Sequence, residues 1–147
     1  MRYTVNQITE GEDELILNYQ QINSEVEEVL FFMEKHRKKL VGKRDGEMIV
    51  FSPQEILYVE KVDNRTFAYT VNNEIQLDLS LHAVEMMLGE ESYFRCSKSM
   101  ILNVNKVERL KSLSSNRIDA TLTNGEHIII SRTYASDFRK LLKGDRS

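Results

Sequence analysis

Residues 41–147 alternate between short apolar runs and polar turn residues, with turn signals about every 8–12 positions. The pairs Asp45-Gly46 and Asn124-Gly125 each separate two such runs, and this kind of pair favours the tight turn of a β-hairpin. The pattern is typical of strands joined by short loops. It predicts a mostly β domain with small helices, an α+β protein, over residues 41–147.

Short helices are predicted where capping residues precede apolar or proline positions. Ser52, Pro53 and Glu55 fit a capping box with proline at the first helical position. Ser80 is expected to cap a second helix, and Thr133 a final one.

Residues 1–40 follow a different pattern. Residues 2–8 alternate between polar and apolar side chains and residues 15–19 are largely apolar, which predicts two strands. A helix is expected next, because Ser24 and Glu27 have the spacing of a capping box. Its apolar positions recur at helical spacing and are Val26, Val29, Leu30 and Met33. The sequence thus predicts an N-terminal strand–strand–helix unit ahead of the β domain.

The composition is that of a globular protein, since 41% of the 147 residues are hydrophobic and 29% are charged. The apolar runs are too short to span a bilayer, so no membrane insertion is expected. The first residues lack the apolar core of a secretory signal. A single cysteine, Cys96, excludes an intrachain disulfide. We therefore expect a cytoplasmic protein.

The charge is divided unevenly along the chain. Residues 1–94 hold 9 basic and 18 acidic side chains, a net charge of −9, whereas residues 95–147 hold 11 and 5, a net charge of +6. An acidic N-terminal part and a basic C-terminal part of the sequence suggest a nucleic-acid-binding face on the second half. A solvated surface with unevenly placed charges is the alternative that charge alone leaves open.

Catalytic and metal-binding patterns are not found in the sequence. His36, His82 and His127 are scattered, and none lies at metal-ligand spacing from a cysteine or a carboxylate. The basic neighbours of Cys96, among them Arg95, would lower a thiol pKa, but a lone buried cysteine is the simpler interpretation. We predict that the protein is not an enzyme and needs no cofactor or metal. A hydrolase using Cys96 or a serine is kept as a rival.

Polar and basic residues gather instead at three connections between β elements: 64–65, 97–99 following Arg95, and 131–133. Lysine, arginine, asparagine and serine are the donors that reach phosphates and base edges. Turns are commonly polar for other reasons, so this pattern alone does not settle the function.

A family resemblance sharpens the interpretation. Residues 94–107, Phe-Arg-Cys-Ser-Lys-Ser-Met-Ile-Leu-Asn-Val-Asn-Lys-Val, resemble the signature of the LytTR family of bacterial DNA-binding domains. Residues 122–134 resemble its closing pattern of Asn-Gly hairpin, apolar strand, Ser-Arg and aromatic, and residues 56–60 resemble its opening strand. Together they extend over about residues 40–143 in the family's order. One departure is Ser97, where many members carry histidine.

The resemblance implies a stack of short antiparallel sheets, with duplex DNA read in successive major grooves by loops instead of a recognition helix. Carried over position by position, Lys98 and Arg132 are the first candidates for base-edge or phosphate contacts, followed by Arg65. The secondary candidates are Asn64, Arg95, Ser97 and Ser99. The implied function is that of a sequence-specific transcription regulator.

The N-terminal 40 residues are too few for the receiver domain that precedes most LytTR domains, so the chain resembles stand-alone LytTR regulators, which are often encoded beside a small membrane protein. We expect the apolar helix face to build a homodimer that reads repeated half-sites. Completion of the chain's own core by this face is the alternative. The rival function is a protein-interaction module that acts through its acidic N-terminal unit without binding DNA.

Overall fold

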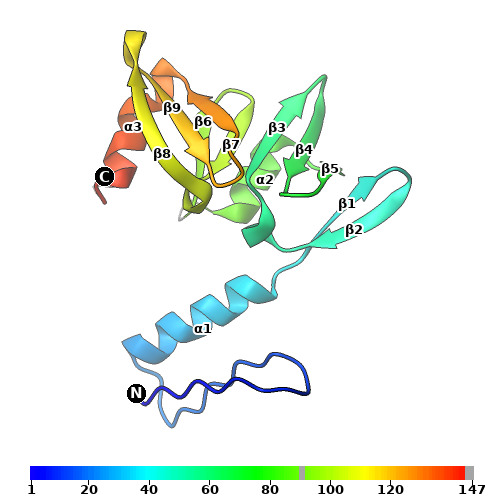
Figure 1. Ribbon diagram of the computed structural model, residues 1–147, viewed down its shortest axis with the longest axis vertical. Helices are drawn as coiled ribbons and strands as arrows, with labels where there is room; N and C mark the ends of the chain where they lie inside the picture. Colours follow the sequence, from blue (N-terminus) through cyan, green and yellow to red (C-terminus); the bar gives the residue numbers. More distant parts are fainter. Residues whose placement is uncertain (90–91, 145–147) are drawn as a thin grey trace. The chain divides into compact units, whose positions relative to one another are not determined.

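The computed structural model describes residues 1–89 and 92–144, with Lys35 described by its backbone alone (Figure 1). The chain divides into two compact units, Met1–Lys38 and Lys39–Ser147, and each is treated by itself. The boundary expected after residue 40 lies two residues from this division.

The first unit contains one helix, α1 (Ser24–Arg37). Its N-cap is Asn23, whose side-chain oxygen accepts a hydrogen bond from the Val26 amide at 2.9 Å, so the cap expected at Ser24 is off by one residue. The two strands predicted at residues 2–8 and 15–19 are wrong, because residues 1–23 form no strand. Alternation suits a pleated backbone, but a strand also needs a partner for its ladder of hydrogen bonds.

The second unit contains a seven-stranded antiparallel sheet of strand order β2-β1-β5-β4-β3-β7-β6. Its strands are β1 (Leu40–Arg44), β2 (Glu47–Phe51), β3 (Tyr58–Val62), β4 (Arg65–Tyr69), β5 (Glu74–Leu77), β6 (Tyr93–Ser97) and β7 (Met100–Asn103). A helix, α2 (Leu81–Leu88), packs on one face, where Leu81 and Val84 share a buried cluster with Val59 and Ile101. Ser80 caps α2 by accepting from the Ala83 amide at 3.0 Å, as predicted.

A three-stranded antiparallel sheet of order β10-β9-β8 lies in the same unit and is built from β8 (Val107–Leu113), β9 (Arg117–Leu122) and β10 (His127–Ile130). The last helix, α3 (Arg132–Leu142), buries Phe138 against this sheet, and the two share a core with Leu102 of β7. The helix begins after Ser131, two residues earlier than the cap predicted at Thr133.

These elements confirm the predicted fold class, which is mostly β with small helices and antiparallel sheets. The hairpin turns at Asp45-Gly46 and Asn124-Gly125 and the capping box between Ser52 and Glu55 also form as predicted. Among the described residues, no helix combines the length and the apolar character needed to cross a membrane.

Candidate nucleic-acid interface

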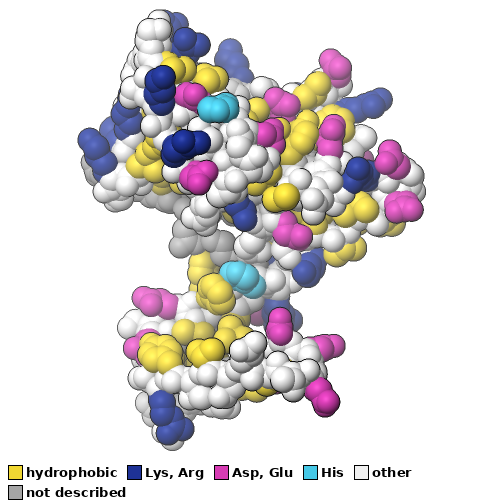
Figure 2. All heavy atoms as spheres, in the orientation of Figure 1, with side chains coloured by type: hydrophobic (Ala, Val, Ile, Leu, Met, Phe, Trp, Pro, Cys, Tyr) yellow, Lys and Arg dark blue, Asp and Glu magenta, His cyan; other side chains and the backbone are white. Residues whose placement is uncertain are grey.

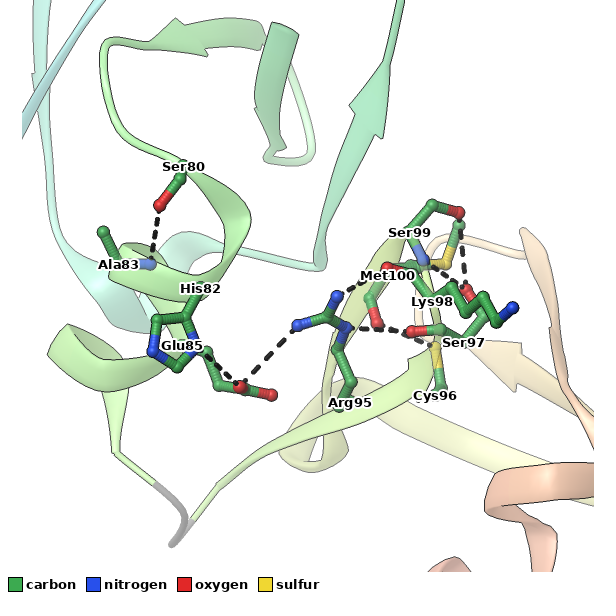
Figure 3. A network of polar contacts seen from close by, with 10 residues as sticks. All are labelled: Ser80, His82, Ala83, Glu85, Arg95, Cys96, Ser97, Lys98, Ser99 and Met100. Carbon is green, nitrogen blue, oxygen red and sulfur yellow. Dashed lines mark hydrogen bonds and ion pairs between the residues drawn. The ribbon is translucent and has the colours of Figure 1, made fainter. Parts of the chain in front are cut away.

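The turn between β6 and β7 is held from within by Arg95 (Figure 3). Its Nε donates to the carbonyl oxygen of Ser97 at 2.9 Å and its Nη2 to that of Lys98 at 2.5 Å. Its Nη1 lies 3.6 Å from a carboxylate oxygen of Glu85 on α2. The pairing register shifts between Arg95 and Ser97, so the strand bends just before the turn. The guanidinium therefore fixes the path of the turn.

The two serines of the same turn bond to each other. The Ser99 amide donates to Ser97 Oγ at 3.2 Å, and the two hydroxyl oxygens lie 3.5 Å apart. Both side chains are half-buried, whereas Lys98 between them is exposed. The turn thus presents the lysine to solvent.

The connection from β10 to α3 is joined to this turn through the backbone. The Ser131 amide donates to the carbonyl oxygen of Cys96 at 3.1 Å. Arg132, the next residue, begins α3 and is exposed.

The turn between β3 and β4 is joined to it from the other side. The Lys61 amide donates to the carbonyl oxygen of Ser99 at 2.8 Å. Two residues later, Asp63 and Asn64 both have positive φ, 49° and 66°, as a tight hairpin turn requires. Asn64 and Arg65 are exposed.

Strand direction places these three segments at the same end of the unit. β6 runs toward its turn, β7 runs away from it, and β3 runs toward it again because each pair is antiparallel. β10 ends beside β6. Residues 64–65, 97–99 and 131–132, which we call the loop row, therefore lie side by side in the order β3–β4, β6–β7, β10–α3.

The loop row offers three unengaged cations. Within the described part of the chain, no hydrogen bond or ion pair occupies the side chain of Lys98, Arg132 or Arg65. Arg95 differs, because its guanidinium forms hydrogen bonds to the turn and an ion pair with Glu85. The row can therefore donate hydrogen bonds to an anionic ligand, while Arg95 holds one of its members in place.

Sequence reasoning missed Glu85. It lies ten positions before Arg95 on a separate helix, and nothing in the local pattern links the two. Only the packing of α2 against the sheet reveals the ion pair.

Cys96 is buried, and burial raises the pKa of its thiol to about 12. The thiol is therefore protonated near neutral pH, and the basic neighbours in sequence do not activate it. In residues 1–89 and 92–144, no three histidine, cysteine, aspartate or glutamate side chains gather as metal ligands would.

The model of the LytTr DNA-binding domain family matches residues 46–143. The sensory transduction protein LytT of Bacillus anthracis is 26% identical over 105 residues, which are 71% of this chain and 43% of that protein. The transcriptional regulatory protein YpdB of Escherichia coli K12 is 25% identical over 100 residues, 67% of this chain and 41% of that protein. The matched stretches thus span less than half the length of these curated relatives.

A solved structure agrees with the sequence matches. The LytTr DNA-binding domain of a putative methyl-accepting/DNA response regulator from Bacillus cereus superimposes with a TM-score of 0.69 at 28% identity. The alignment covers 72% of this chain and 97% of that domain. These findings confirm the resemblance to the family drawn from the sequence, and the chain belongs to the LytTr family of DNA-binding domains.

Proposed function

We propose that the protein binds duplex DNA sequence-specifically through the loop row and thereby regulates transcription. The observation that carries the proposal is that Arg65, Lys98 and Arg132 are exposed, with no side-chain partner among the described residues, at one end of the domain that the family matches. Cationic and amide side chains on short loops suit the donor and acceptor pattern of the major groove.

The residues are assigned different tasks. Lys98 and Arg132 contact base edges or phosphates, and Arg65 with Asn64 extends the contact along the duplex. Arg95 is a positioning residue, since its guanidinium bonds to the turn itself. Ser97 and Ser99 shape the same turn and offer hydroxyl groups at its sides.

The test is fluorescence anisotropy with duplex DNA from the protein's own upstream region and a scrambled duplex of equal length, over a salt series. Lys98→Ala and Arg132→Ala should lose the preference for the specific duplex. Lys106→Ala is the matched control, because it removes one charge at the opposite end of the three-stranded sheet, before β8 begins.

Specific binding that weakens steeply with salt and is lost in both variants supports the function and the site together. Equal weak binding to both duplexes would favour the rival interaction module. Specific binding that survives both substitutions would keep the function and reject these contact residues.

We further propose that two copies associate through the N-terminal unit and read repeated half-sites in the cytoplasm, where bacterial DNA lies. Of the apolar face expected to dimerise, Val26 is buried and Val29, Leu30 and Met33 are partly buried. Beside it on α1, Phe31 and Phe32 are 59% and 50% exposed. Light scattering at tens of micromolar should give the mass of a dimer, and Phe31→Ser with Phe32→Ser should give a monomer. A monomeric parent protein would reject this proposal.

The resemblance to stand-alone regulators suggests another partner for the same unit, a small membrane protein encoded nearby. Co-purification with that protein, lost on Phe31→Ser with Phe32→Ser, would support this alternative for a protein found to be monomeric.

A further inference from the structure

We propose that the turn between β8 and β9, Ser114–Asn116, together with Arg117 and Arg139, forms a fourth contact at the flank of the loop row and binds the phosphate backbone of the same duplex. The inference rests on the proposed function. It adds a site that no motif in the sequence indicated.

The register of the three-stranded sheet gives this turn its place. Ile130, the last residue of β10, pairs with Ile118 of β9. The segment that continues from Ile130 into Arg132 therefore lies beside Arg117, at the end of the sheet where β8 turns into β9. The β8–β9 and β3–β4 turns lie at the same end of the unit (Figure 1). The order of tips becomes β3–β4, β6–β7, β10–α3 and β8–β9.

Two guanidinium groups are anchored at the turn. Arg139 of α3 donates from Nη1 to Asn116 Oδ1 at 2.6 Å. Arg117 donates from Nε to the carbonyl oxygen of Ser114 at 3.4 Å. Each contact uses one of the five N–H donors of an arginine, so each group keeps donors for a ligand. Within the described residues, neither arginine forms an ion pair with a carboxylate.

The backbone conformation of the β8–β9 turn makes it project from the end of the three-stranded sheet. Ser115 and Asn116 have positive φ, 61° and 56°, which reverses the chain within three residues. Both side chains are exposed. A narrow exposed tip can approach the backbone of a duplex without burying other parts of the sheet.

The charge around the turn is positive. Lys111 lies on the same face of the sheet as Arg117, because Leu113 pairs with Arg117 and residues 111 and 113 share a face. Asp119 on that face is engaged by His127, whose Nδ1 lies 2.9 Å from its carboxylate. Lysine and arginine side chains gather over this part of the surface (Figure 2).

Phosphate is the ligand this arrangement favours over a base edge. A guanidinium that is pinned by a protein acceptor presents its remaining N–H groups as a fork, which matches two phosphate oxygens. The tip also lies at the outer end of the row, beyond Arg132, so it meets the duplex at the margin of the contacted bases. Phosphate contacts there add affinity and fix orientation without adding sequence preference.

The experiment measures the salt dependence of binding for Arg117→Ala, Arg139→Ala and the double variant, on the specific and the scrambled duplex. Each substitution should make the plot of log K against log salt less steep. The magnitude of its negative slope should fall by about 0.9, as expected for one lost phosphate contact. The ratio of specific to scrambled affinity should stay that of the parent protein. Lys106→Ala should leave both quantities unchanged.

Two further variants separate the charge from the fold. Arg117→Lys and Arg139→Lys keep the charge and should restore most of the slope, and circular dichroism should match the parent in every variant. Slopes equal to that of Lys106→Ala, while the parent still binds specifically, would overturn the fourth contact alone. A lowered specificity ratio would overturn the phosphate assignment, and a parent protein without specific binding would overturn the proposed function and this inference with it.

Discussion

The guanidinium of Arg95 donates to the carbonyl oxygen of Lys98, so one basic residue holds the backbone from which another extends into solvent. The two residues thus have different tasks despite their equal charge. A substitution that preserves charge should separate the two tasks.

Arg95→Lys should weaken specific DNA binding about 5- to 30-fold, because it removes one or two hydrogen bonds worth about 1 kcal/mol each to the turn. The salt slope should stay unchanged, since the charge remains. Anisotropy over a salt series measures both quantities. Glu85→Gln removes the ion pair but leaves the turn's hydrogen bonds, so its effect should be smaller. An unchanged affinity in Arg95→Lys would show that the turn keeps its shape without this side chain.

Gly42→Ala should destabilise the second unit by about 1–3 kcal/mol, the cost of overpacking. A Cβ at Gly42 would overlap Cγ2 of Ile75 and lie 2.7 Å from the carbonyl oxygen of Gln76, so β1 and β5 would have to move apart. Urea unfolding measures the loss. Val41→Ala, an exposed change on the same strand, should cost less than about 0.5 kcal/mol. Equal midpoints for the two variants would contradict the close approach.

Raising the pH above 9 should lower the free energy of unfolding through Cys96. Burial raises the pKa of this thiol from 9.0 to about 12, so the unfolded chain loses the proton first and the folded state becomes less favoured as pH rises between those values. The contribution at pH 10 is about 1 kcal/mol. Urea unfolding at pH 7.5 and pH 10 should show a smaller drop for Cys96→Ala than for the parent. Identical drops would assign the pH dependence to other groups, such as Tyr93, whose pKa burial raises to about 12.

Removing the hydroxyl of Tyr58 should cost about 1–2 kcal/mol of stability, because that group donates to a carboxylate of Glu126 at 2.9 Å and charged acceptors make stronger bonds. The ring should keep its stacking on Tyr69, 4.5 Å away between centroids. Urea unfolding of Tyr58→Phe measures the loss, and Glu126→Gln, which keeps an acceptor, should cost less. DNA binding should be retained, since Glu126 lies at the opposite end of β10 from the loop row. A Tyr58→Phe midpoint equal to the parent's would show that the bond adds no stability.

Features encoded by neighbouring residues could be predicted from the sequence. The Asp45-Gly46 turn and the Ser52 capping box depend on a few adjacent positions, so the local sequence was sufficient to predict them. The strands expected at residues 2–8 and 15–19 do not form, because alternation specifies a strand's faces but supplies no partner strand.

The loop segments could be named from the sequence, but their neighbours could not. Lys98 and Arg132 lie 34 positions apart, and the backbone bond between Ser131 and Cys96 joins their segments in the folded chain. The contact between Arg139 and Asn116 likewise spans 23 positions and follows from the packing of α3.

The tips of the loop row are joined to one another by backbone hydrogen bonds, from Lys61 to Ser99 and from Ser131 to Cys96, so the fold fixes the intervals between them. Inserting one base pair between two contacted bases shifts the second by about 3.4 Å along the duplex, and the tips cannot follow without breaking the hydrogen bonds that join them. On the proposed function, DNA-binding affinity would depend on the spacing between the contacted bases as strongly as on their identity.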